Sequence, residues 1–246
     1  MPTLIDTELL ALRTTRLPWA LLAGAMVLTA VLAVNPVLAA GTNAAPSIGT
    51  AGALLAVLGA TGRGNLMILV LGVLAVTGEF RHATVTATFL HTPHRIRVLA
   101  AKAAAVVVVA AVAAVADLAV AVAVGLATGA LPGALLNADV VLHVAGLLLA
   151  YPLYGLISVA AGALIVFQPV AVLLPLAWVL YLEDFVLRLA PYAVTPWTLN
   201  GVTAALAHAA DVADLLPMAV GGGAVLAYGL LLFALGAARL AYRDIT

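Results

Sequence analysis

Residues 140–182 read VVLHVAGLLLAYPLYGLISVAAGALIVFQPVAVLLPLAWVLYL and contain no Asp, Glu, Lys or Arg. A helix that crosses a membrane needs about 20 consecutive apolar residues. These 43 residues therefore fit two membrane-spanning helices joined by a very tight turn. Gln168-Pro169 is the best position for that turn, and Ala161-Gly162 is the alternative. The stretch indicates an integral membrane protein of the all-α class.

The composition of the whole chain indicates the same class of protein. Of its 246 residues, 66% are hydrophobic and 8% are charged, whereas a soluble domain carries roughly 25% charged residues. So few charges cannot cover a water-facing surface, which excludes a soluble globular enzyme, and the high hydrophobicity excludes a disordered chain. The net charge is zero and no Lys/Arg-rich run is present, so nothing points to nucleic acid. The absence of cysteine excludes disulfides and thiol catalysis.

The apolar stretches predict six spans in a single transmembrane domain, residues 1–246. Ile5, Leu9 and Leu12 share one helical face, which predicts an amphipathic elbow helix in the membrane interface before the first span; a loose polar tail is the alternative. The first apolar stretch is too long for a signal-peptide core, so we expect it to be retained. Residues 41–59 are typical of an outer loop with one short apolar helix. The expected elements are the elbow at 3–16, spans at 17–39, 60–78, 98–125, 140–162, 164–182 and 215–238, a polar loop at 79–97 and an outer loop at 183–214.

Basic residues are distributed unequally between the two sides that six spans define. By the positive-inside rule, the side richer in Lys and Arg is cytoplasmic. The sequence therefore predicts a plasma-membrane protein with both termini and the loop at 79–97 in the cytoplasm. Arg63, at the outer end of the second expected span, is placed to reach the headgroups. The terminus side holds Arg13, Arg16, Arg81, Arg95, Arg97, Lys102, Arg239 and Arg243, and the other side holds Arg63 and Arg188.

Residues 78–102 form the most polar stretch of the chain. They hold Glu79, four basic residues and three of the five histidines. Charged side chains do not enter lipid cheaply, so we expect a short helix over about 79–90 at the membrane face, with its charges toward water, headgroups or a partner protein. Membrane topology alone explains Arg95, Arg97 and Lys102, but it explains Glu79 less well because orientation requires no acid.

The order Glu79-Phe80-Arg81-His82-Ala83-Thr84, followed by a proline, an arginine pair and Ala-Ala-Lys, resembles the first cytoplasmic loop of the type-2 permease family of ATP-binding-cassette (ABC) exporters. Ala83 stands where that family commonly has glycine. Two weaker similarities agree: residues 14–19 before the first span resemble the elbow of the family, and Arg243-Asp244-Ile245 resembles its Arg-Asp-Ile tail. In layout, the resemblance covers the whole chain.

The resemblance implies the fold and role of an ABC permease subunit, with the loop between spans two and three as a cytoplasmic coupling helix. Glu79, Phe80, Arg81, His82 and Thr84 would then face a separate ATPase subunit, and a second permease copy or a related permease would complete the translocation path. Residues 59–64 lack the Lys-Ser/Thr of a P-loop, so ATP and magnesium belong to the partner. Few fixed charges in the spans favour an amphipathic substrate, and no cofactor is expected on this chain.

Three polar residues in or beside the spans allow a second hypothesis. We expect these residues toward the outer side; they are Asp117, Asp139 and His143. They are either part of an ion relay or in contact with water at the outer interface. No row of acids runs through the expected core, which favours contact with water. The alternative functions are an ion-coupled secondary transporter and a membrane scaffold without transport. H-E-x-x-H and G-x-S-x-G motifs are absent, and no metal site or enzyme activity is predicted.

Overall fold

The computed structural model describes residues 2–40, 46–82, 84, 94–130, 137–189, 192–209 and 215–242. Regular structure within these residues is helical, without a β-strand. Six of the described helical segments are long and apolar enough to cross a membrane, which confirms the all-α class and agrees with a multi-pass membrane protein. They are Arg16–Leu38, Ala51–Arg81, Arg95–Ala127, Ala138–Ile165, Gln168–Leu187 and Met218–Tyr242.

The N-terminal residues form a helix of their own before the first span. Helix α1 (Pro2–Thr14) ends before Thr15, whose backbone is extended, and α2 (Arg16–Leu38) begins directly after it. The indole Nε1 of Trp19 donates a hydrogen bond to the Arg13 carbonyl oxygen, 3.0 Å away, across this break. The apolar face predicted from the sequence is half-buried, and α1 packs against α6. The alternative of a loose polar tail is therefore wrong.

The second span is longer than the sequence predicts. Helix α3 (Ala51–Gly59) continues through the 3₁₀ turn η1 (Ala60–Gly64) into α4 (Asn65–Arg81). The short apolar helix expected in the outer loop is thus part of the span, and the boundary at residue 60 is wrong because the 3₁₀ turn keeps the chain helical. Arg63 consequently lies about 18 Å along the helix from its Ala51 end, at 1.5 Å per residue, and not at the outer end of the span.

Helix α7 (Ala138–Ile165) is the central helix of the bundle. It packs against α4, α6 (Arg95–Ala127) and α11 (Met218–Tyr242). A Cβ at Gly162 would lie 3.0 Å from the Val73 carbonyl oxygen, so the missing side chain lets α7 and α4 approach closely. The Ala- and Gly-rich composition therefore serves packing between spans.

The turn between spans four and five lies close to its expected position. Helix α7 ends at Ile165, and α8 (Gln168–Ala177) begins after two intervening residues, Val166 and Phe167. Pro169 occupies the first turn of α8, where its missing N–H breaks no helical hydrogen bond. Ala161 and Gly162 lie buried within α7, so the alternative turn is wrong.

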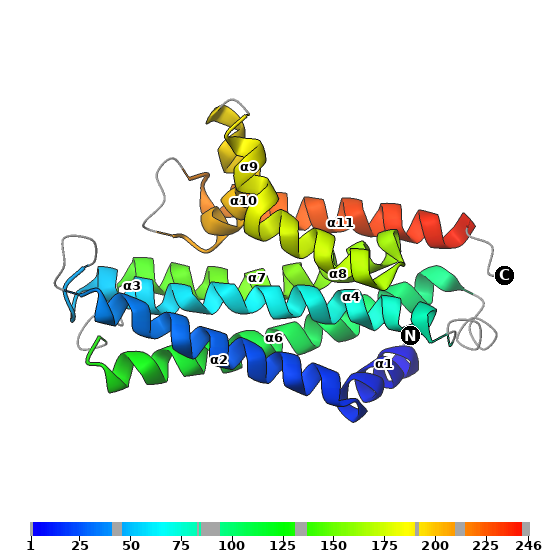
Figure 1. Ribbon diagram of the computed structural model, residues 1–246, viewed down its shortest axis with the longest axis horizontal. Coiled ribbons are helices and arrows are strands. Elements are labelled where there is room, and N and C mark those ends of the chain that lie inside the picture. Colours follow the sequence, from blue (N-terminus) through cyan, green and yellow to red (C-terminus); the bar gives the residue numbers. More distant parts are fainter. Residues whose placement is uncertain are drawn as a thin grey trace.

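The fifth span is irregular. After α8 the chain forms a π-helical turn, η2 (Trp178–Leu182), and then α9 (Glu183–Leu187). Pro175 lies inside α8 and removes one backbone donor just before the irregular turn. The span therefore extends beyond residue 182, its expected end. Figure 1 shows this segment tilted away from the other spans.

The segment before the last span contains short helices, as expected for an outer loop with apolar pieces. A 3₁₀ turn, η3 (Tyr192–Trp197), precedes α10 (Leu199–Leu206), which packs against α11. The start of α1 and the end of α11 lie at the end of the bundle that also holds the end of α4 and the start of α6 (Figure 1). The chain thus returns to the side from which it starts, as an even number of spans requires.

Candidate functional site

Three charged residues from three helices meet at the end of the bundle that holds both termini. Lys102, two turns into α6, has its Nζ 2.7 Å from Glu8 Oε2 of α1 and 2.6 Å from Glu79 Oε1 of α4. Their side chains are 6%, 16% and 25% exposed, respectively. One ammonium group therefore lies between two acids, balances one of their two charges and weakens their mutual repulsion. We call Glu8, Glu79 and Lys102 the Lys102 cluster; it joins α1, α4 and α6 next to the predicted coupling loop.

Three arginines join the other helix ends on the same side. Arg81 Nη1 donates a hydrogen bond to Gln168 Oε1 at the start of α8, 3.1 Å away. Arg95 Nη1 donates to the Leu240 carbonyl oxygen of α11 at 2.8 Å, and Arg239 donates to the Leu164 carbonyl oxygen of α7. The last carbonyl groups of a helix have no partner within the helix and accept such donors. Cationic side chains thus link the ends of α1, α4, α6, α7, α8 and α11.

The residues predicted to face an ATPase fall into two groups. Glu79 points to Lys102, and Phe80 is half-buried against the apolar cluster around Val76 and Leu99. Arg81, His82 and Thr84 are exposed, and the Thr84 backbone N–H donates to the Glu79 carbonyl oxygen at 3.0 Å. Most of the expected coupling helix, residues 83 and 85–93, lies outside the described residues, as does the tail Arg243-Asp244-Ile245.

The basic residues that topology alone explained also differ in their surroundings. Arg97 is exposed at the start of α6, in keeping with a purely topological role. Lys102 is buried and paired with two acids, and Arg95 reaches α11. Sequence reasoning missed these pairings because Glu8, Glu79 and Lys102 are far apart along the chain. The available signal was the position of the three residues near ends of spans on the same side: Glu8 precedes the first expected span, Glu79 follows the second, and Lys102 lies near the start of the third.

Asp117 lies in a second polar arrangement, away from the Lys102 cluster. Tyr151 Oη is 2.6 Å from Asp117 Oδ2 and 2.6 Å from the Thr61 carbonyl oxygen. Asp117 is 1% exposed and Tyr151 is fully buried. The prediction that Asp117 lies in water is therefore wrong, because α3 and α7 both pack against this part of α6. The extended second span, which the sequence analysis did not anticipate, is what covers it.

The Tyr151 hydroxyl is the donor of both short contacts. A tyrosine hydroxyl has a single hydrogen, and neither the Thr61 carbonyl nor a carboxylate has a proton to give. The hydrogen of Tyr151 is therefore shared between Asp117 Oδ2 and the Thr61 carbonyl oxygen. Gly64 faces the pair, and a Cβ there would overlap both side chains. The 3₁₀ turn with Gly64 thus brings the backbone of span two close enough to accept from Tyr151.

Asp139 and His143, in the first two turns of α7, have different surroundings. Asp139 is exposed, and its Oδ1 lies 3.4 Å from Nε2 of His208, which follows α10. The exposure of Asp139 is compatible with a water-facing side chain, whereas His143 is only 4% exposed and does not face water. In the part of the chain that the structure describes, no group of three or more His, Asp or Glu side chains is arranged to hold a metal ion.

Glu183 is a buried acid that the sequence analysis assigned to the outer loop. It is 2% exposed, and its Oε1 accepts a hydrogen bond from the Asn200 backbone N–H at 2.6 Å. The Asn200 side chain in turn donates from Nδ2 to the Val179 carbonyl oxygen at 2.9 Å. The carboxylate thus satisfies a free N–H in the first turn of α10, where negative charge is favourable. This contact fixes α10 to the fifth span.

Comparison with known proteins assigns no family. The chain matches no protein-family model, no curated protein and no solved structure. The resemblance of residues 79–84 to the ABC permease loop therefore stays a prediction.

Proposed function

We propose that the chain is the permease subunit of an ABC exporter, which moves an amphipathic substrate across the plasma membrane with a separate P-loop ATPase. The observation that carries this proposal is the Lys102 cluster. We call residues 79–84 the candidate docking segment. The cluster fixes Glu79, the first residue of this segment, to α1 and α6. A displacement of residues 79–84 would move three packed helices together, because little flexible chain lies between them.

The exposed part of the same segment supports the proposal. Arg81 and His82 face outward and supply positive charge for an acidic surface on a partner. Arg81 also contacts Gln168, so the connection between spans four and five lies beside the docking segment. The start of α1 and the end of α11 are at this end of the bundle (Figure 1), and this is the side on which the basic residues accumulate, which favours a cytoplasmic position.

The mechanism we propose is alternating access driven by ATP on the partner chain. Closure of two ATPase subunits would push the docking segments and favour the outward-open state of two permease copies. Spans one, five and six have only 22%, 11% and 17% of their apolar windows buried within the chain. These faces are available to lipid and to a second permease copy.

The docking proposal is tested by purifying the chain from its native membrane in mild detergent and identifying the proteins that accompany it. We expect a P-loop ATPase with the wild-type chain and its loss in an Arg81→Ala/His82→Ala double variant, because both side chains are exposed and replacing them disturbs no core. Arg97→Ala is the matched control: it removes an exposed arginine at the same end but outside the docking segment, and should retain the ATPase.

Two results would contradict the proposal. Equal recovery of the ATPase with the wild-type chain and the double variant would reject these residues as the docking site. An intact wild-type preparation without any ATPase would reject the ABC assignment.

A second candidate, an ion-coupled secondary transporter, is favoured by one observation: the buried carboxyl of Asp117 within the third span. Intramembrane acids are candidates for proton or ion binding. This function requires transport to depend on Asp117 or Asp139, whereas the ABC proposal requires dependence on Arg81 and on ATP. A scaffold without transport would show neither dependence.

A further inference from the structure

Arg63 lies well inside a membrane-spanning segment, where burying a charged side chain costs free energy. It lies 16 residues before Glu79, about 24 Å along the span at 1.5 Å per residue, and the helix continues for 12 more residues beyond it. A charged side chain at such a depth normally faces a water-filled cavity or a ligand, and marks a functional site.

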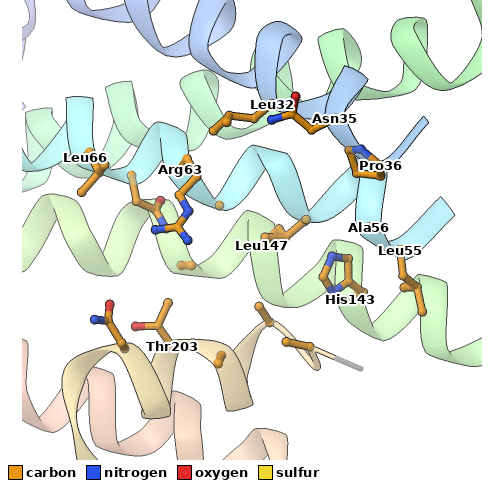
Figure 2. A pocket seen from close by; sticks show the side chains of 18 of the residues that line it. Leu32, Asn35, Pro36, Leu55, Ala56, Arg63, Leu66, His143, Leu147 and Thr203 are labelled. Atoms are coloured by element: carbon orange, nitrogen blue, oxygen red, sulfur yellow. The ribbon is translucent and has the colours of Figure 1, made fainter. Parts of the chain in front are cut away.

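A cavity of about 1120 Å³ lies beside Arg63. It is formed by α2, by the α3–α4 span, by α7, and by the fifth span with α10. Figure 2 shows the Arg63 side chain extending from its helix toward α10, where Thr203 points into the same space. Part of the wall is apolar, with Leu32, Leu55, Leu66 and Leu147. The cavity thus combines a cation with a surface suited to hydrocarbon.

The polar groups of the cavity are not satisfied by the protein alone. Arg63 is exposed to the cavity and forms none of the ion pairs or hydrogen bonds found within the described residues. Asn65 also lines the cavity; it is 3% exposed, and its side-chain oxygen has no hydrogen-bond partner. A buried acceptor without a donor is costly. Among the described residues, neither an anion for Arg63 nor a donor for Asn65 is present, so the two residues suit a ligand that supplies both.

One acid lines the same cavity without neutralising Arg63. Asp184, in α9, is a lining residue, but no ion pair joins it to Arg63 within 4.0 Å among the described residues. The neighbouring Glu183 is not among the lining residues, and its Oε1 accepts from the Asn200 backbone N–H. Thr203, which points into the same space as Arg63, is uncharged (Figure 2).

We propose that this cavity binds an amphiphile whose head group carries both a negative charge and a hydroxyl group. The anion pairs with Arg63, the hydroxyl donates to Asn65, and the hydrocarbon part lies against the leucine side chains. A free inorganic anion satisfies Arg63 but leaves the apolar wall uncovered, so an amphiphile fits the lining better. The site goes beyond the proposed function, because its residues all belong to one chain and binding needs no ATPase.

The test is a titration of the purified full-length chain with dioctanoylphosphatidylglycerol in mild detergent, followed by native mass spectrometry. Parallel titrations use dioctanoylphosphatidylcholine, which has no hydroxyl, and inorganic phosphate, which has no hydrocarbon. We expect the phosphatidylglycerol to bind most tightly. Arg63→Gln should weaken its binding by about 10-fold or more, since a charge-assisted hydrogen bond is lost. Arg188→Gln, which removes an exposed arginine outside the cavity, is the matched control and should bind like the wild type.

A second variant guards against a folding defect in Arg63→Gln. Ala204→Trp keeps every charge but fills the cavity next to Thr203, and should also weaken binding. The proposal is overturned if both variants bind as the wild type does, if phosphatidylcholine binds equally well, or if phosphate alone competes as strongly as the lipid. None of these outcomes affects recovery of an ATPase, so this proposal and the permease proposal fail separately.

Discussion

Replacement of Asp117 separates its hydrogen bond with Tyr151 from any role of its charge. In Asp117→Asn, the amide oxygen can still accept from the Tyr151 hydroxyl, so we expect little change in stability. Asp117→Leu has a similar size but no acceptor, and leaves the buried Tyr151 hydroxyl with one partner fewer. We expect a loss of about 1–3 kcal/mol, measured by thermal unfolding of the two variants in the same detergent.

The same pair of variants distinguishes the candidate functions. An ABC permease should keep its transport activity with asparagine at position 117, because only the structural hydrogen bond is needed. Loss of transport in a stable Asp117→Asn protein would instead support ion coupling. Equal stability of the asparagine and leucine variants would contradict a structural role for the hydrogen bond from Tyr151 to position 117.

At the scale of helices, the Lys102 cluster predicts a strongly non-additive result. Lys102→Met leaves two acids of low exposure side by side without their shared cation, and breaking a buried pair in this way costs roughly 3–5 kcal/mol. Adding Glu8→Gln and Glu79→Gln removes the uncompensated charges and should restore most of the stability. Thermal unfolding of the single and triple variants measures the difference.

A structural consequence accompanies this change in stability. Because the cluster joins α1 to α4 and α6, the single variant should also lose protection of α1 backbone amides against hydrogen exchange. The cluster would be energetically unimportant if Lys102→Met were as stable as the wild type and α1 kept its protection.

The helices themselves were largely predictable, because long apolar runs respond to the membrane and not to particular neighbours. The turn before Gln168-Pro169 was predictable for a local reason, the lack of a donor in proline. The continuation of α3 into α4 was not predictable, because glycines around residue 60 are typical of a loop. The 3₁₀ turn there is associated with the hydrogen bond from Tyr151 to the Thr61 carbonyl oxygen, a contact across 90 residues of sequence.

The candidate sites were less predictable than the fold. Glu79 stood out because an acid is unexpected in a basic loop, but its partners Glu8 and Lys102 depend on how α1 and α6 pack. Arg63 was expected to reach the headgroups because its span was expected to begin at residue 60. With the longer span, the same residue lies inside the bundle and lines the cavity. Burial of Glu183 and His143 likewise follows from tertiary packing, which no local pattern encodes.

For the whole molecule, the orientation in the membrane is directly testable because the chain contains no cysteine. We expect His82→Cys to react with a membrane-impermeant maleimide only in opened cells or inverted vesicles, and Arg188→Cys to react in intact cells. Both positions are exposed, so a failure to react does not result from burial. Labelling of both positions from the same side would contradict six spans with cytoplasmic termini.

The length of α6 has a consequence for how the protein sits in a bilayer. Its 33 residues extend about 50 Å at 1.5 Å per residue, whereas the hydrocarbon core is about 30 Å thick. Lys102 lies seven residues, or about 10 Å, from the start of this helix. With the Lys102 cluster at the boundary of the hydrocarbon, the first two turns of α6 would lie among the lipid headgroups and in the water beyond them. A protein that approaches from the water would then meet the start of α6 before it meets the hydrocarbon.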